Sequence, residues 1–267
     1  ALDALARDAD TSVVVLVSTP PSPWVAARVL DRAVTTDRAV VASFLGYTAP
    51  AQHTGVSLTA TLEDAARAAA SLSGAGTVSN HPTLRVTLPR FTREQKWLRA
   101  FYAGGTLAYE ALTLLSPPLR VATNLRATSA PHFGTFTDAA HTLVDLGDRH
   151  FTGGHAHPRY DLGPRLEAIR SVANDPSALA LLLDVPLGDG AHPDPGAEIA
   201  GAVREAREVA AARGGVLVAV ASVTGTEGDA QRHTRQIHAL LAAGVEVCSS
   251  NAAAVRRARS VLLGEWP

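Results

Sequence analysis

Short, continuously apolar runs alternate along this chain with amphipathic, alanine-rich stretches of helical length. The clearest runs are VVVLVS at 13–18, LALLLDV at 179–185 and VLVAVAS at 216–222. A strand that is apolar along its whole length must be buried on both faces, which is typical of parallel sheets covered by helices on each side. The chain is therefore predicted to be a three-layer α/β protein with parallel sheets.

The expected elements fall into two groups, separated by a stretch rich in Gly, Ser, Thr and Pro. We predict a first domain over residues 1–78, a linker over 79–96 and a second domain over 97–267. Strands are expected at 13–18, 39–45, 141–146, 179–185, 216–222 and 245–249, and helices at 23–34, 61–72, 97–115, 164–174, 195–213, 229–244 and 251–264.

The two groups are similar to each other in sequence. VVVLVSTPPS, a helix and AVVASFLGYTAP in the first group parallel LALLLDVPLGDG, a helix and VLVAVASVTGTEG in the second. Two related α/β units in tandem are the simplest explanation. Because the first copy lacks an opening strand, we expect further sequence upstream of Ala1.

Charge and composition argue against several classes of function. Lys and Arg number 24 against 25 Asp and Glu, so no basic field indicates nucleic acid or an anionic membrane surface as a partner. The single cysteine, Cys248, cannot form an internal disulfide, and we expect a cytoplasmic protein. No apolar run approaches the roughly 20 residues of a membrane helix. Small molecules or protein partners are the expected ligands.

The stretch HFTGGHAHPRYD at 150–161 allows four interpretations: a metal site, a phosphate site, a phosphorylated histidine or an ordinary loop. His150, His155, His157 and Asp161 are possible metal ligands, but no second cluster with ligand spacing is present, so no metal is predicted. An exposed imidazole is also a competent nucleophile toward a phosphoryl group. The sequence does not choose among the three histidines for that role.

Glycine-rich loops lie beside several of the predicted strands and helices. Parallel strands end at the edge of the sheet where helix amino termini offer free N–H groups to an anion. Each such loop alone is usually a turn, but several of them at one edge favour an anion site. The predicted phosphate- and substrate-binding residues are Thr152, Gly153, Gly154, Gly104, Gly105, Thr106, Gly225, Thr226 and Glu227.

The tandem units resemble the ligase domains of the succinyl-CoA synthetase superfamily, the CoA-ligase or NDP-forming acyl-CoA synthetase group, and FdrA-type proteins in particular. The resemblance implies two tandem flavodoxin-like domains that handle phosphate between helix amino termini. The stretches that carry it span most of the chain: VVVLVSTPPS, FLGYTAP, YAGGTLAYEAL, HTLVDLGDRHFTGGHAHPRYD, DVPLGDGAHPDP and ASVTGTEGDAQ.

The sequence departs from the synthetase pattern in ways that bear on mechanism. The segment after FLGYTAP is AQHTGVSLTATLED, which lacks a Gly-His-Ala-Gly phosphohistidine motif, and the flanks of His53 do not match it. The letters GGHA at 153–156 imitate that motif but lie where the resemblance places a glycine loop facing the phosphate. The phosphohistidine role is therefore not carried over to His155. No ATP-grasp pattern is found, and nucleotide-driven ligation by this chain alone is not expected.

Two functions remain open after this comparison. The first is an acyl-CoA synthetase-like ligase or transferase that handles an acyl phosphate or carbamoyl phosphate, with His155 or His157 supplying charge or a proton. The second is a non-catalytic or accessory subunit of an oxamate carbamoyltransferase-like assembly, serving as a partner-binding platform. In both, we expect a homo-oligomer or hetero-oligomer, phosphate or acyl phosphate as ligand, and CoA only through an upstream domain.

Overall fold

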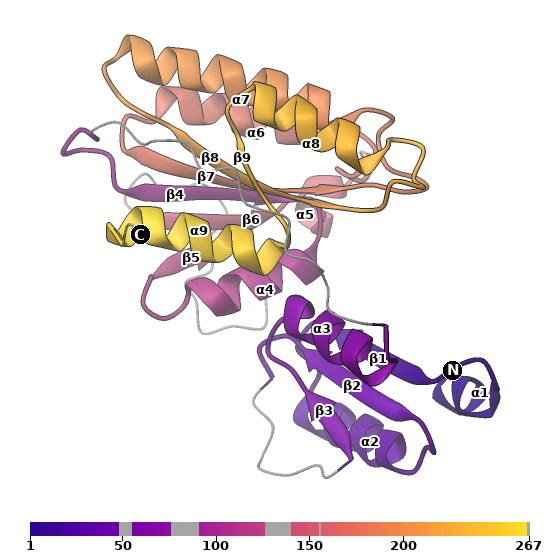
Figure 1. The fold of residues 1–267 in the computed structure, drawn as a ribbon. Helices are drawn as coiled ribbons and strands as arrows, with labels where there is room; N and C mark the ends of the chain where they lie inside the picture. Colours follow the sequence, from indigo (N-terminus) through magenta and orange to yellow (C-terminus); the bar gives the residue numbers. More distant parts are fainter. Residues whose placement is uncertain (48–54, 76–90, 126–139, 155, 266–267) are drawn as a thin grey trace. The chain divides into compact units, whose positions relative to one another are not determined.

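The chain forms two compact units, Ala1–Asn80 and His81–Pro267, and each unit has its own parallel sheet (Figure 1). The predicted fold class, α/β with parallel sheets, is confirmed. No helix in the described parts of the chain is long and apolar enough to cross a membrane. The structure, a computed structural model, describes residues 1–47, 55–75, 91–125, 140–154 and 156–265.

The first unit contains a three-stranded sheet in the order β1-β2-β3. Helix α2 buries Ala26 and Leu30 against Val14 and Val40 of the sheet, and Ser22 caps this helix by accepting a hydrogen bond from the Val25 N–H. The elements are α1 (Leu2–Arg7), β1 (Val13–Ser18), α2 (Pro23–Val34), β2 (Ala39–Phe44), β3 (Val56–Leu58) and α3 (Leu62–Leu72).

The second unit contains a six-stranded sheet in the order β5-β6-β4-β7-β8-β9, and every pair of neighbours is parallel. Helices α6, α7 and α8 cover one face, and α4 and α9 cover the other (Figure 1). The elements are β4 (Trp97–Tyr102), α4 (Gly105–Leu115), β5 (Val121–Thr123), β6 (His141–Asp145), α5 (Arg149–Thr152), α6 (Gly163–Ser171), the 3-10 helix η1 (Val172–Asn174), β7 (Ala178–Pro186), α7 (Pro195–Ala212), β8 (Val218–Thr224), α8 (His233–Ala242), β9 (Glu246–Cys248) and α9 (Asn251–Leu263).

Strand β7 shows why this sheet has helices on both faces. Its side chains alternate between two apolar cores, with Leu181 and Leu183 in the core that includes α7, and Ala180 and Leu182 in the core that includes α9. All four are fully buried. A strand of this kind is stable only when both of its faces are covered, and the apolar run at 179–185 is therefore explained by its central place in the sheet.

The expected helix at 97–115 is wrong over its first part. Residues Trp97–Tyr102 form strand β4, which lies in the middle of the sheet between β6 and β7, and the helix begins only at Gly105. The aromatic residues of WLRAFY suit a strand, and two consecutive glycines disfavour a helix interior. The short elements α1, β3, β5 and α5 were also not predicted.

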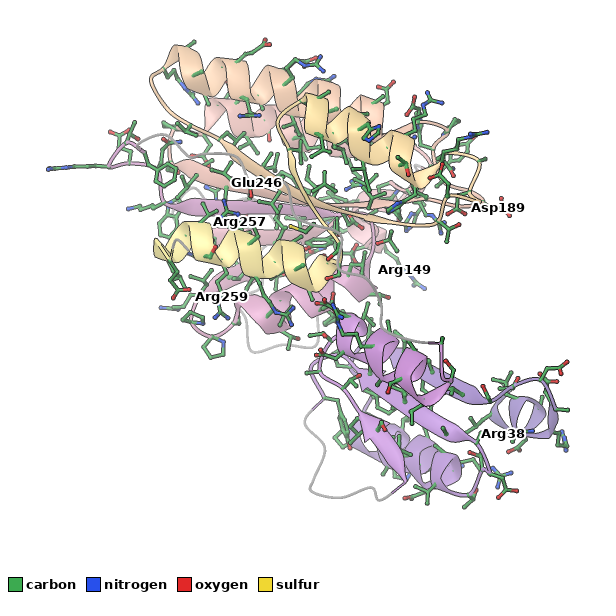
Figure 2. All side chains as sticks on the ribbon, in the orientation of Figure 1. Arg38, Arg149, Asp189, Glu246, Arg257 and Arg259 are labelled. Atoms are coloured by element: carbon green, nitrogen blue, oxygen red, sulfur yellow. The ribbon has the colours of Figure 1, made fainter. Side chains whose placement is uncertain are left out.

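A buried ion pair joins the last strand to the last helix of the second unit. Arg257 of α9 donates to both carboxylate oxygens of Glu246 on β9, with Nε–Oε2 and Nη2–Oε1 distances of 2.5 and 3.0 Å. Figure 2 labels both residues. Glu246 is 1% exposed, so its charge depends on this arginine for compensation.

Arg257→Ala should destabilise the second unit by about 3 kcal/mol or more, because it leaves the Glu246 carboxylate buried without a counter-ion. Urea denaturation followed by circular dichroism measures the free energy of unfolding. The matched control is Arg204→Ala, which removes an exposed arginine of α7 and should change that free energy by less than about 0.5 kcal/mol. Equal losses in the two variants would contradict the role given to the pair.

Candidate functional site

The carboxyl ends of β4, β6 and β7 meet at the topological switch point of the second sheet. Without the short edge strand β5, the order β6-β4-β7-β8-β9 is the flavodoxin-like order 2-1-3-4-5. The chain leaves β4 for one side of the sheet and returns through α6 to β7 on the other side. Open α/β sheets bind their ligands at this point, outside the carboxyl ends of the strands.

Helix α4 begins directly after β4 and presents an uncapped amino terminus at this edge. Its N-cap residue is Gly104, in an extended conformation with φ −173°, and no side chain of the described residues caps the helix. The first N–H groups of a helix have no acceptor within the helix. No acceptor among the described residues reaches those of Gly105, Thr106 and Leu107, which leaves them available to a ligand. The helix dipole adds a partial positive charge at the same place.

In each of the other long helices of this unit, one N–H of the first turn donates to a side-chain oxygen of the protein. Asp161 accepts from the Gly163 N–H of α6 at 2.9 Å, and the Gln236 side chain accepts from the Gly196 N–H of α7 at 2.7 Å. For the last two, Glu227 accepts from Thr234 N–H of α8 at 3.0 Å, and Ser250 accepts from Ala253 N–H of α9 at 3.0 Å. This contrast distinguishes α4 from the other helices that begin at strand ends.

Asp145, the last residue of β6, faces the first turn of α4. Its Oδ1 accepts from the Gly147 N–H at 2.8 Å. The Asn124 side chain donates to the carbonyl oxygen of Asp145 at 2.8 Å and accepts from its N–H at 2.9 Å. Oδ2 of Asp145 lies 3.2 Å from the position that a Cβ on Gly105 would take. Asp145 is 8% exposed. Burial, helped by the charges of Asp148 and Asp184 and opposed by the Gly147 hydrogen bond, raises the pKa of its carboxyl to about 6.

Asp184 and Arg165 form a buried ion pair behind this point. Asp184 Oδ1 accepts from the Ala103 N–H and from Nη2 of Arg165, both at 2.9 Å. The same Nη2 donates to the carbonyl oxygens of Asp184 at 2.6 Å and Phe101 at 3.4 Å. Burial raises the pKa of Asp184, while the guanidinium of Arg165 opposes that shift. Nε and Nη1 of Arg165 find no partner among the described residues.

Gly147 lies where three groups converge on the end of β6. A Cβ placed on it would lie 2.7 Å from the Ala103 carbonyl oxygen, 2.9 Å from Nε2 of His157 and 3.1 Å from Oδ1 of Asp145. The imidazole Nδ1 of His157 accepts from the Arg159 N–H at 3.2 Å, so in the neutral ring the proton is on Nε2. We call Ala103, Gly105, Asp145, Gly147 and His157 the switch-point cluster.

The structure separates the sequence-predicted site residues into different environments. Gly105 and His157 belong to the switch-point cluster, and Gly104 and Thr106 are adjacent to it along α4. His155 lies outside the described residues. Among the residues that are described, no group of three or more His, Cys, Asp or Glu side chains is placed to hold a metal ion.

The glycine loop after β6 follows a short helix instead of preceding one. Thr152 is the last residue of α5, its N–H and hydroxyl both reach the Asp148 carbonyl, and the Gly153 N–H donates to the Arg149 carbonyl at 3.1 Å. Gly154 adopts a positive φ of 86°, which favours glycine. The N–H groups of Thr152 and Gly153 are therefore engaged within this turn.

The loop after β8 is held by carboxylates of its own chain. The N–H and hydroxyl of Thr226 both donate to Asp229, at 2.5 and 3.3 Å. A Cβ on Gly225 would lie 2.6 Å from Cβ of Leu187, so glycine is required there by packing. Glu227 caps α8. This loop offers fewer free donors than its glycine and threonine content predicts.

Asp145, Gly147, Arg165 and Asn124 were not predicted as site residues. The stretch LVDLGD, which contains Asp145 and Gly147, ends a predicted strand. An acidic residue with a glycine two positions later at such a strand end was the available signal. Nothing in the local sequence around Arg165 indicates that it pairs with Asp184, because the pairing depends on the crossing of α6 over β4 and β7.

The CoA-ligase family model matches residues 101–261, which include the whole switch-point cluster and more than half of the chain. The chain belongs to the CoA-ligase family. The predicted resemblance to succinyl-CoA synthetase-type ligase domains is thereby confirmed at the level of the family. The FdrA type remains a prediction.

Two individual proteins are similar to this chain. The uncharacterized protein YahF of Escherichia coli (strain K12) is 33% identical over 263 residues, a match that covers 94% of this chain and 50% of YahF. The chain thus spans about half the length of this curated relative. The ATP citrate lyase from Methanothrix soehngenii, solved with citrate and coenzyme A, aligns over 96% of this chain and 39% of its own with 15% identity and a TM-score of 0.37.

Gly147→Ala should destabilise the second unit by roughly 1–3 kcal/mol, because the new methyl group would collide with the backbone oxygen of Ala103 and must displace β4 or β6. Thermal unfolding followed by circular dichroism measures the loss. Gly201→Ala is the matched control, since a Cβ there meets open space on α7 and alanine suits a helix interior. A Gly147→Ala melting temperature equal to that of the control would contradict the role given to Gly147 in packing β6 against Ala103.

Proposed function

We propose that this CoA-ligase family member handles an acyl phosphate, with carbamoyl phosphate as a candidate, and that the phosphate binds at the amino terminus of α4. The uncapped first turn of α4 at the switch point is the observation that carries the proposal. Free backbone N–H groups and a helix dipole are a sufficient site for a phosphate. Family membership supplies the acyl-CoA synthetase-like chemistry.

This geometry suits transfer of an acyl group from phosphate to a nucleophile. When the bond between the acyl carbon and the bridging oxygen breaks, that oxygen leaves with the phosphate and takes up the electron pair. N–H groups already aimed at the phosphate stabilise the charge without reorganisation. In this proposal His157, whose Nε2–H lies within the switch-point cluster, donates a hydrogen bond or a proton to the leaving phosphate.

CoA enters the proposal only as an acceptor held by an upstream domain. The nucleotide part of CoA carries several phosphates, which require accessible basic side chains or further free helix termini. Arg165 is fully buried and bound to Asp184, so it cannot reach such a polyphosphate. The switch-point cluster therefore fits the phosphate of a small acyl phosphate better than the nucleotide of CoA.

A second candidate function, an accessory subunit that binds a partner protein, is favoured by the first unit. Strand β1 lies at the edge of the described three-stranded sheet, and Val15 and Val17 on one of its faces are 44% and 49% exposed. Exposed apolar residues on an edge strand are typical of interaction surfaces. Such a subunit would belong to an oxamate carbamoyltransferase-like assembly, and would bind no acyl phosphate by itself.

Gly104→Asp should abolish phosphate and carbamoyl phosphate binding while it leaves the fold intact or more stable. An N-cap aspartate accepts hydrogen bonds from the first turn of its own helix, so it would occupy the N–H groups that we assign to the ligand. Titration calorimetry with inorganic phosphate and with fresh carbamoyl phosphate, at about pH 8, measures binding, and thermal unfolding measures stability.

Gly201→Asp, which introduces the same charge on α7 where a Cβ meets open space, is the matched control and should bind as the unaltered protein does. Equal binding by Gly104→Asp would place the anion elsewhere. No binding by the unaltered protein, together with phosphate release only when partner subunits and oxamate are added, would favour the accessory function.

A further inference from the structure

One carboxylate oxygen of Asp145 lies beside the proposed phosphate site and is available to a ligand. Oδ1 is engaged by the Gly147 N–H, whereas no donor among the described residues reaches Oδ2. Oδ2 lies 3.2 Å from the Cβ position of Gly105, the first residue of α4. Asp145 as a whole residue is 8% exposed. It is therefore aimed at the same first turn that offers free N–H groups.

An acceptor beside a helix amino terminus is unfavourable for a ligand that carries only anionic oxygens. Two negative charges at contact distance repel one another most strongly where water is excluded. A ligand that has an anionic group for the N–H donors and a hydrogen-bond donor for Oδ2 removes this cost, and a bond to a charged acceptor is stronger than one between neutral groups. The cluster thus combines a place for an anion with a place for a donor.

We infer that Asp145 is a specificity-determining residue, which accepts a hydrogen bond from a donor on the acyl group and makes the site prefer amide-bearing acyl phosphates over methyl-bearing ones. This inference rests on the proposed binding of acyl phosphate at α4. Carbamoyl phosphate presents an NH₂ group where acetyl phosphate presents a methyl group. Only the NH₂ group of carbamoyl phosphate can donate a hydrogen bond to Oδ2 of Asp145.

Several charged groups surround Asp145 and set its protonation. Asp148 faces it from the turn after β6, Asp184 from β7 with Arg165 of α6 behind it, and His157 from the loop before α6. Burial and the two acidic neighbours raise the pKa of Asp145 to about 6. Above that pH the carboxylate is ionised and accepts a donor from the ligand. Below it the carboxyl carries a proton, and the reason for the preference is lost.

The test compares two stable phosphonates of nearly equal shape, phosphonoacetamide and acetonylphosphonate, which differ by an NH₂ in place of a CH₃. Titration calorimetry at about pH 8 should show that the unaltered protein binds phosphonoacetamide roughly tenfold more tightly. The preference should fall as the pH is lowered through about 6. Because the phosphonate groups of the two ligands titrate alike, the ratio of affinities reports on the protein.

Asp145→Asn is the decisive variant, since an amide oxygen still accepts the Gly147 N–H while an NH₂ replaces Oδ2. We expect it to lose the preference and its pH dependence, and to bind both phosphonates. Equal binding of both ligands by the unaltered protein would overturn the inference and leave the phosphate site in place. Failure to bind either ligand would overturn the proposed function. If the variant does not fold, the pH dependence measured on the unaltered protein still tests the inference. A preference that stays constant as the pH is lowered through about 6 would overturn it.

Discussion

The buried ion pair between Arg165 and Asp184 fixes the sheet edge on which the candidate site is built. Oδ1 of Asp184 accepts hydrogen bonds from the Ala103 N–H and from the guanidinium of Arg165, and that guanidinium also donates to the carbonyl oxygen of Phe101. The end of β4, the end of β7 and helix α6 are therefore joined at one point. Desolvation offsets much of the attraction in so deep a pair, so we assign it a role in geometry more than in stability.

The position of α4 follows from this anchor. β4 is held at Ala103, and the helix starts within the next two residues, both of which are glycines. No side chain then covers the first turn, and Asp145 of β6 lies against it. Gly147 allows β6 to approach the Ala103 carbonyl, which brings the carboxylate and the helix terminus together. The amino terminus of α4, with its partial positive charge, and the carboxylate of Asp145 thus meet at the ends of three neighbouring strands.

The sequence predicted the architecture better than the site. Continuous apolar runs such as 13–18 and 179–185 identified β1 and β7, since full burial leaves no polar face to obscure the pattern. The prediction of a helix over strand β4 is wrong because only Ala103 and Gly104 separate its six residues from an apolar helix. The short strands β3 and β5 have too few residues for a periodic pattern to identify them.

The three glycine-containing loops at 104–106, 152–154 and 225–227 have similar composition. Composition alone could therefore not show which of them has N–H groups free to bind an anion. Which N–H groups remain free depends on partners that are distant in sequence or only visible in the fold: the caps of α7 and α8 come from Gln236 and Glu227. The Thr226 N–H donates to the Asp229 carboxylate, and the Gly153 N–H donates to the Arg149 carbonyl. Free donors at α4 are therefore a tertiary property.

Amide chemical shifts give the most direct test of where the anion binds. In a ¹⁵N-labelled sample titrated with phosphonoacetamide, the signals of Gly105, Thr106 and Leu107 should shift most, because a phosphonate would accept hydrogen bonds from these groups. The largest shifts at residues 152–154 or 225–227, with none in the first turn of α4, would contradict the assignment of the site.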